Sequence, residues 1–242
     1  MEVVNKSLSE QILEILRERI TGFKLKPGTR INIDELAREF KVSKTPVRDA
    51  LNKLIEKNLV EVNPRVGYYV KNLTKKEIEE ICELRRVLET YALRKANFNN
   101  SDKEKLKALM QKIDQAERVY KKKGDRHLFD ETDRELHGMI IQKSENRYLK
   151  KVFLQLFDLI NLLQHTHQRV MSSIEEHRKL IRAILDGNYE DAQKILIDHL
   201  SKVEAGSIEV LTLMREKPLS SSASKESKGC KIIIKGGEKC FC

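Results

Sequence analysis

Four residues with metal-binding side chains occur at spacings that suit a helical protein. Asp133 and His137 are four residues apart, so they share one helix face on consecutive turns. His177 lies ten residues before Gly187 and His199 twelve after it. At a helical rise of about 1.5 Å per residue, these are about 15 and 18 Å from the turn, at similar heights in an antiparallel hairpin. Three imidazoles and one carboxylate could then converge on one divalent ion per subunit, with Zn²⁺ and Ni²⁺ both suitable.

The remaining histidines lack such a pattern. We interpret His127, His165 and His167 as surface or core residues. A metal held by three histidines and a carboxylate could activate water, which makes a hydrolase the enzymatic alternative. The chain has no His-Glu-x-x-His helix, however, and no separate general base stands out near the four residues. We therefore expect a metal site that orders the fold or gates an effector.

Arg85 is a candidate for binding a small carboxylate. It projects toward the interior if its helix packs on one apolar face, namely Ile81, Leu84, Leu88 and Ala92. A guanidinium there could bind a carboxylate through two parallel hydrogen bonds. The alternative is a surface ion pair with Glu89, four residues further on.

A second group of residues suits recognition of nucleic acid. Lys44, Thr45 and Arg48 lie on one side of the first turns of a helix for which Ser43 is the candidate cap. Lys44 and Thr45 can reach phosphate or base, and Arg48 can donate two hydrogen bonds to guanine O6 and N7.

The elements around this group predict a winged helix-turn-helix. Hydrophobic spacing indicates helices over 8–20, 33–40 and 43–57, and alternating residues indicate strands over 59–62 and 67–70. Arg65 and Gly67 then fall in the wing, where arginine suits phosphate or a narrow minor groove and glycine permits close backbone approach. In this fold the second helix of the helix-turn-helix enters the major groove. A protein-interaction module with a basic face is the alternative.

Longer helices follow Leu73. The pattern predicts six of them, over 74–96, 101–122, 125–143, 146–170, 173–185 and 189–214, with a break at 171–172. Ser7 with Glu10, Thr74 with Glu77 and Ser101 with Glu104 have capping-box spacing. Short connections imply an antiparallel bundle, so we expect a mostly α protein. The domains are 1–73, 74–215 and a disordered tail over 216–242, which carries Cys230, Cys240 and Cys242.

Composition limits the possible classes of function. The formal net charge of +10 divides into +4 over 1–73 (14 basic, 10 acidic), +2 over 74–214 (26 and 24) and +4 over 215–242 (7 and 3). The basic excess is compatible with binding to nucleic acid but does not by itself indicate that function. No apolar run reaches the roughly 20 residues of a membrane helix, and four cysteines make no disulfide framework in a chain of 242 residues. We expect a cytoplasmic protein with no membrane partner.

Several motifs resemble a known family. The segments 42–51 (VSKTPVRDAL) and 65–70 (RVGYYV) are similar to those of the GntR family of bacterial transcription regulators. The segment 83–89 (ELRRVLE), with Ala92 and residues 133–137, resembles the FCD branch, which includes FadR-like regulators. The sequence departs from the family at Asp34, where many relatives have a basic phosphate-binding residue. Arg38, one turn later, is the candidate replacement.

The resemblance implies a function for each group of residues. It implies a homodimer that reads a near-palindromic operator in double-stranded DNA, most simply as a repressor, and a small organic acid effector. Asp133, His137, His177 and His199 match the ligands of the metal-binding FCD subgroup. Relatives that bind acyl-CoA lack this set, so a fatty acyl ligand is disfavoured. A sensor in which the ion itself is the signal is the alternative to an organic effector.

Overall fold

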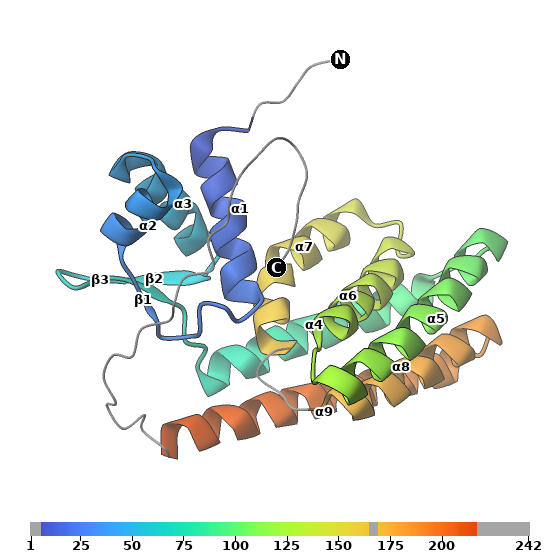
Figure 1. Ribbon diagram of the computed structural model, residues 1–242. Helices are drawn as coiled ribbons and strands as arrows, with labels where there is room; N and C mark the ends of the chain where they lie inside the picture. The colour runs from blue at the N-terminus through green and yellow to red at the C-terminus, as the bar shows by residue number, and fades with distance from the viewer. Residues whose placement is uncertain (1–5, 165–168, 217–242) are drawn as a thin grey trace.

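The computed structural model describes residues 6–164 and 169–216, and within them it confirms the expected fold class. The first part of the chain forms three helices and three short strands: α1 (Leu8–Thr21), β1 (Arg30–Ile31), α2 (Ile33–Phe40), α3 (Lys44–Glu56), β2 (Val60–Asn63) and β3 (Gly67–Val70). The second part is helical: α4 (Lys75–Lys95), α5 (Asn100–Lys123), α6 (His127–Gln142), α7 (Arg147–Gln164), α8 (Val170–Leu185) and α9 (Tyr189–Glu216) (Figure 1).

The first part is a winged helix-turn-helix. Helices α1 and α3 pack together through apolar residues at helical spacing, including Leu16, Ile20, Leu51 and Leu54, all fully buried. The sheet has the order β1-β3-β2 and is antiparallel, with Val60 opposite Val70 and Ile31 opposite Tyr68. Strand β1 was not expected from the sequence, because two residues are too few to show alternation. The hairpin of β2 and β3 projects from the molecule as the wing (Figure 1).

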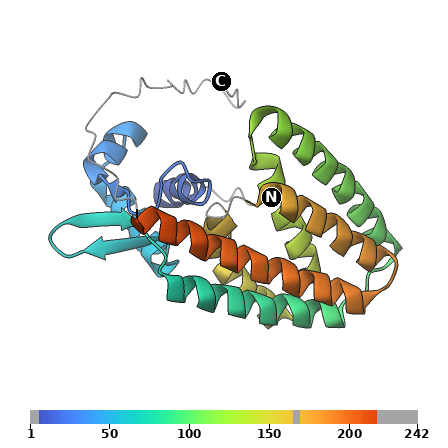
Figure 2. The ribbon, with the colours of Figure 1, turned by 90° about the horizontal axis from the view of Figure 1, so that it is seen from below.

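The second part is a helical bundle in which α4 and α9 lie side by side along one edge (Figure 2). Helix α6 packs against α4 and helix α8 against α9, and α5 packs on α6 and α8. The bundle brings together four helices, α4, α6, α8 and α9, that carry the candidate metal and carboxylate residues.

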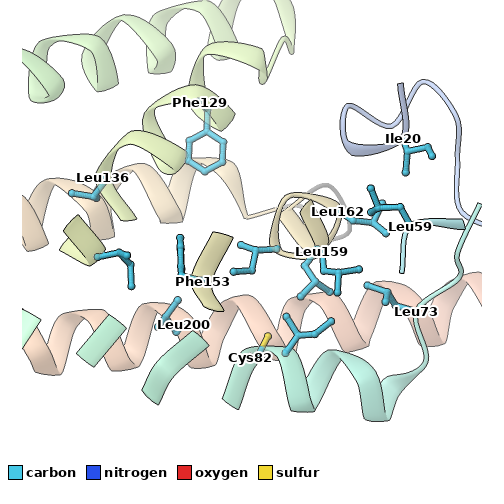
Figure 3. Packing of buried hydrophobic residues seen from close by; sticks show 14 of the residues in the cluster. Ile20, Leu59, Leu73, Cys82, Phe129, Leu136, Phe153, Leu159, Leu162 and Leu200 are labelled. Atoms are coloured by element: carbon cyan, nitrogen blue, oxygen red, sulfur yellow. The ribbon is translucent and has the colours of Figure 1, made fainter. Parts of the chain in front are cut away.

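Helix α7 connects the bundle to the winged helix. Its buried Asp158 pairs with Arg17 of α1, at 3.1 Å, and with Lys57 at the end of α3, at 3.6 Å. Figure 3 shows that apolar packing is continuous across this junction, from Ile20 through Leu162 and Leu159 toward Leu73. The two parts of the chain therefore share one hydrophobic core rather than meeting through a loose linker.

Two predicted helix boundaries are confirmed and two are wrong. Ser7 with Glu10 and Thr74 with Glu77 form the expected capping boxes. Ser101 does not cap α5, because Asn99 and Asp102 form the capping box two residues earlier. The break expected at 171–172 lies inside α8, which begins at Val170 because that side chain packs in the core.

Some expectations fall outside the described residues, namely those for His165, His167 and the tail beyond Glu216. Among the helices that the structure describes, none is both long enough and apolar enough to cross a membrane.

Candidate functional site

The start of α3 forms a basic surface. Lys44, Thr45 and Arg48 are exposed, whereas Val47 and Ala50 on the other side of the helix are buried. The first turn of α3 contains no acidic residue, so the positive end of the helix dipole is not offset by α3 itself. This arrangement favours an anion such as a phosphate at the helix start.

Ser43 fulfils only part of its expected role. It occupies the N-cap position of α3 with an extended backbone, but its side chain makes no capping hydrogen bond. Its hydroxyl group remains exposed beside the first-turn amides of α3. Arg38 is also exposed and borders the same helix-turn-helix corner, in a hollow that it shares with Lys41, Ser43 and Lys44.

The wing and α3 lie on opposite sides of one cleft of about 330 Å³. Its lining includes Lys44 and Arg48 from α3, Gly67 from the wing and Arg30 from β1. Gly67 has a φ of 134°, which favours glycine, and Arg65 at the wing tip is exposed with a φ of 65°. The predicted DNA contacts of the helix and wing are thus neighbours in the structure.

Sequence reasoning missed Arg30. Its Nη2 donates to the carbonyl oxygen of Val66 at 3.0 Å, so the side chain connects β1 to the wing loop. The nearest atom to a Cβ placed on Gly67 would be Arg30 Nε at 3.7 Å. Only the pairing of β1 with β3 places Arg30 here, and a two-residue strand is too short to show an alternating pattern.

Asp133, His137, His177 and His199 come together in the bundle interior, although they lie on three different helices. All four are buried, and one ligand atom from each lies within 4.8 Å of the others. The two Nε2 atoms of His177 and His199 are 3.4 Å apart, and Asp133 Oδ1 is 3.3 Å from His177 Nε2. Two nitrogens each about 2.1 Å from one tetrahedral ion lie about 3.4 Å apart, so these separations suit a metal.

Two carboxylates orient the histidines from outside the cluster. Glu89 of α4 hydrogen-bonds to His137 Nδ1, and Glu176 of α8 accepts a hydrogen bond from His199 Nδ1 at 2.8 Å. A carboxylate on Nδ1 favours the proton there, which leaves the Nε2 lone pair facing the cluster. Neither glutamate was expected in this role. Glu89 was considered only as a surface partner of Arg85, and Glu176 had no signal beyond its position next to His177.

The electrostatics of the cluster favour ionised carboxylates, and burial lowers the pKa of both His177 and His199. Burial lowers the pKa of His199 to about 3, even though Glu176 favours the charged form. Burial opposes ionisation of Glu89, but His137 and Arg85 outweigh it and lower the pKa of Glu89 to about 2. The pKa of Asp133 also lies well below its usual range, because His137, His177 and Arg85 outweigh the cost of burial. Neutral imidazole and carboxylate are the protonation states that bind metal.

Arg85 points into the bundle, as expected, although Leu84 of the expected inner face is exposed instead. Arg85 also forms the alternative ion pair. Its Nε donates to Glu89 Oε1 at 2.6 Å, and both side chains are almost completely buried. The pair is therefore internal, and the expectation of a surface pair is wrong. Arg85 Nη2 is buried without a hydrogen-bond partner and lies 4.0 Å from Asp133 Oδ2. One donor of the guanidinium thus remains available beside the metal ligands.

Comparisons with known proteins find matches for both parts of the chain. Residues 8–70 match the family model "Bacterial regulatory proteins, gntR family", and residues 80–202 match the FCD domain. The chain is 28% identical to the transcriptional regulator YdhC of Bacillus subtilis over 79% of this chain and 87% of that one. It is 30% identical to the gluconate operon transcriptional repressor of B. subtilis, over 78% and 72% of the two chains.

Solved structures share the fold. A GntR regulator from Rhodococcus superposes with a TM-score of 0.73 at 21% identity, over 84% of this chain and 99% of that one. The FCD domain of TM0439 matches 59% of this chain and 99% of its own. Its metal-free form has a TM-score of 0.51 at 32% identity, and its Zn²⁺-bound form 0.50 at 31%.

We expect the metal-free protein to lose stability as the pH falls below 6.5. An unfolded His199 takes up a proton near pH 6.5, whereas the folded one stays neutral to about pH 3. The unfolded state then binds more protons, so the free energy of unfolding decreases by about 1.4 kcal/mol per pH unit for this residue. His199→Asn should flatten urea-unfolding stability between pH 6.5 and 5, and the same change at exposed His127 should not. An unchanged slope in His199→Asn would contradict a neutral, buried His199.

Proposed function

Because the chain belongs to the GntR family of bacterial regulators and carries an FCD domain, we propose that it is a homodimeric repressor whose operator affinity responds to a small carboxylate bound at or near a divalent metal. Its matching families and named relatives are transcription regulators and not enzymes. Residues 1–73 form the DNA-binding domain in this proposal, and 74–215 bind the effector and the second subunit.

The observation that supports operator binding is the common surface of α3 and the wing. Exposed Lys44 and Arg48 share one cleft with Gly67, and Thr45 is exposed on the same helix start, so a duplex could meet the helix in its major groove and the wing beside it. Phosphate contacts would fix the register, and Arg48 is the side chain best suited to reading guanine.

Arg48→Ala should weaken operator binding by roughly 5- to 150-fold, the range for one bidentate base contact. The operator sequence is first obtained by selecting a randomised pool of 30-base-pair duplexes with the wild-type protein. Affinity is then measured by fluorescence anisotropy across a salt series. Arg118→Ala serves as the control, because Arg118 is an exposed arginine on α5, away from this surface. Enrichment of no sequence, or an affinity that does not fall with salt, would contradict operator binding.

The metal proposal is supported by the arrangement of lone pairs. Three Nε2 atoms and one carboxylate oxygen converge in a buried space, and Glu89 and Glu176 fix the tautomers of two of the imidazoles. The likeness to a Zn²⁺-bound FCD domain adds independent support. Zn²⁺ and Ni²⁺ both suit this ligand set. The ion would supply a positive charge in the interior, beside Arg85.

The carboxylate proposal is supported by the free donor of Arg85. A carboxylate bound there could accept from Nη2 while one of its oxygens approached the ion. Glu89 holds the rest of the guanidinium in place, so the donor is oriented before the ligand arrives. This is the feature that favours an organic acid effector over a sensor in which the metal alone is the signal.

His177→Ala should lose bound metal on dialysis, whereas His127→Ala, which alters an exposed histidine, should keep one ion per subunit by elemental analysis.

In the metal-loaded protein, one or more members of a panel of mono-, di- and tricarboxylates should raise the melting temperature. A carboxylate at 100 times its Kd should add about 2.7 kcal/mol to the free energy of unfolding. Arg85→Lys keeps the positive charge beside Glu89 but lacks the several N–H donors of a guanidinium. The variant should therefore retain the metal and lose the rise in melting temperature caused by the carboxylate. Operator affinity that changes on chelation without any carboxylate would favour the metal sensor instead.

The homodimer proposal is supported by an exposed stripe on α4. The residues Glu80, Leu84, Val87, Tyr91 and Arg94 recur at alternating spacings of four and three, the pattern of a two-helix seam. Leu84, Val87 and Tyr91 at its centre are 38%, 58% and 38% exposed. Figure 2 shows α4 at the edge of the bundle, where a second subunit can approach it.

The charges at the two ends of the stripe are complementary to those of a second α4 that packs against it in antiparallel orientation. Acidic residues precede Val87 and basic residues follow it at equal distances: Glu80 and Arg94 are each seven residues away, and Glu79 and Lys95 are each eight away. A two-fold axis at Val87 therefore places each acidic residue opposite a basic one, as a self-complementary interface requires. These exposed pairs set the register more than the affinity, which comes from the apolar centre.

Val87→Lys should dissociate the dimer in analytical ultracentrifugation. Leu8→Lys is the matched control, because Leu8 on α1 is 57% exposed and lies outside the stripe. Reversing one charge, in Glu80→Arg, should weaken the dimer, and adding Arg94→Glu to that variant should restore it. A dimer that survives Val87→Lys, or no recovery in the double variant, would contradict the antiparallel α4 interface.

A further inference from the structure

The DNA-facing surface carries a carboxylate at an unexpected place. Asp34, in the first turn of α2, pairs with Lys44 in the first turn of α3, with Oδ1 and Nζ 2.5 Å apart. Both residues line the cleft between α3 and the wing. Asp34 also lies near Arg38 and Arg48, and Lys44 in particular lowers the pKa of Asp34, so this carboxylate is negatively charged at neutral pH.

The pair is open to exchange with an external anion. The side chains of Asp34 and Lys44 are 59% and 57% exposed, so water screens their attraction. A phosphate of DNA that approached Lys44 would compete with Asp34 for the same ammonium group. The carboxylate would also repel that phosphate, because the two like charges would lie on the same face.

We propose that Asp34 lowers the affinity of this protein for DNA by occupying Lys44 as an internal competitor of the phosphate backbone. The inference rests on the proposed function only in requiring that this face bind DNA. Asp34 makes no required structural contact in this role: its own amide is satisfied by the Asn32 side chain, and the cap of α2 does not use the Asp34 carboxylate. Asparagine at this position preserves the shape of the side chain and removes the charge.

The effect should be independent of DNA sequence. Binding to phosphates accounts for most of the affinity for nonspecific DNA, and each additional phosphate contact steepens the dependence of log affinity on log salt by about 0.9. Release of Lys44 should therefore strengthen binding to selected and random duplexes by a similar factor. A base contact by Asp34, for example with the amino group of cytosine, would instead affect only the selected duplex.

The experiment measures five proteins: wild type, Asp34→Asn, Lys44→Met, the double variant and a control. Each is measured with the selected 30-base-pair duplex and with a random-sequence one. We expect Asp34→Asn to bind both duplexes roughly 3- to 10-fold more tightly near 0.1 M salt, with a salt slope steeper by about 0.9. The gain should disappear in the Lys44→Met background. Glu39→Gln is the control, because it adds the same unit of charge but disrupts a pair with Arg19 away from the cleft.

Four outcomes would overturn the inference. Weaker binding by Asp34→Asn to both duplexes would mean that Asp34 positions Lys44 for contact, and weaker binding to the selected duplex alone would mean that Asp34 reads a base. A gain that persists without Lys44, or that Glu39→Gln reproduces, would mean a general effect of charge. Failure of the wild-type protein to bind either duplex would instead contradict the proposed function, so the two failures are distinguishable. Circular dichroism of each variant checks that the fold is retained.

Discussion

The structure depends on the pairing of charged groups inside the helical bundle. Arg85, Glu89 and Asp133 are buried together with three histidines, and charged groups taken out of water are strongly destabilising unless they pair. Each of them has a partner from a different helix: Arg85 and Glu89 of α4 reach His137 and Asp133 of α6, which in turn face α8 and α9. One buried polar cluster therefore links four helices of the bundle.

The same cluster is mechanically connected to the DNA-binding domain. Glu176 holds His199 and also pairs with Arg169, immediately before α8. Helix α7 packs directly against α4 and α6, which carry members of the cluster, and also against α1, with Asp158 pairing with Arg17 and Lys57. Because the apolar core is also continuous here, α7 cannot shift in the bundle without affecting α1. A response of operator affinity to a ligand requires such a connection, and this fold contains it.

The sequence predicted the elements well and the contacts between them less well. Helices such as α4 have strong periodicity and a local capping signal in Thr74 and Glu77, which need no tertiary information. Strand β1 and the role of Arg30 exist only through pairing with β3, so no local pattern reveals them. The four candidate ligands could be named because their resemblance to the metal-binding FCD pattern agrees with their side-chain types and helical spacing. Glu89 was misjudged for the opposite reason: its spacing from Arg85 is that of an ordinary surface pair, and only the packing of α4 on α6 shows that it is buried.

Two ion pairs of similar chemistry illustrate how burial determines function. Arg85 and Glu89 are 3% and 0% exposed, so removing either leaves an uncompensated charge in the core, and the pair acts as a fixed part of the site. Asp34 and Lys44 are more than half exposed, so either can take an alternative partner from solvent with little loss. The buried pair can orient a donor toward a ligand because it does not exchange. The exposed pair can regulate contact with a polyanion because it does. The net charge of +10 does not distinguish the buried pair from the exposed one, because the difference arises from the position of each pair in the fold.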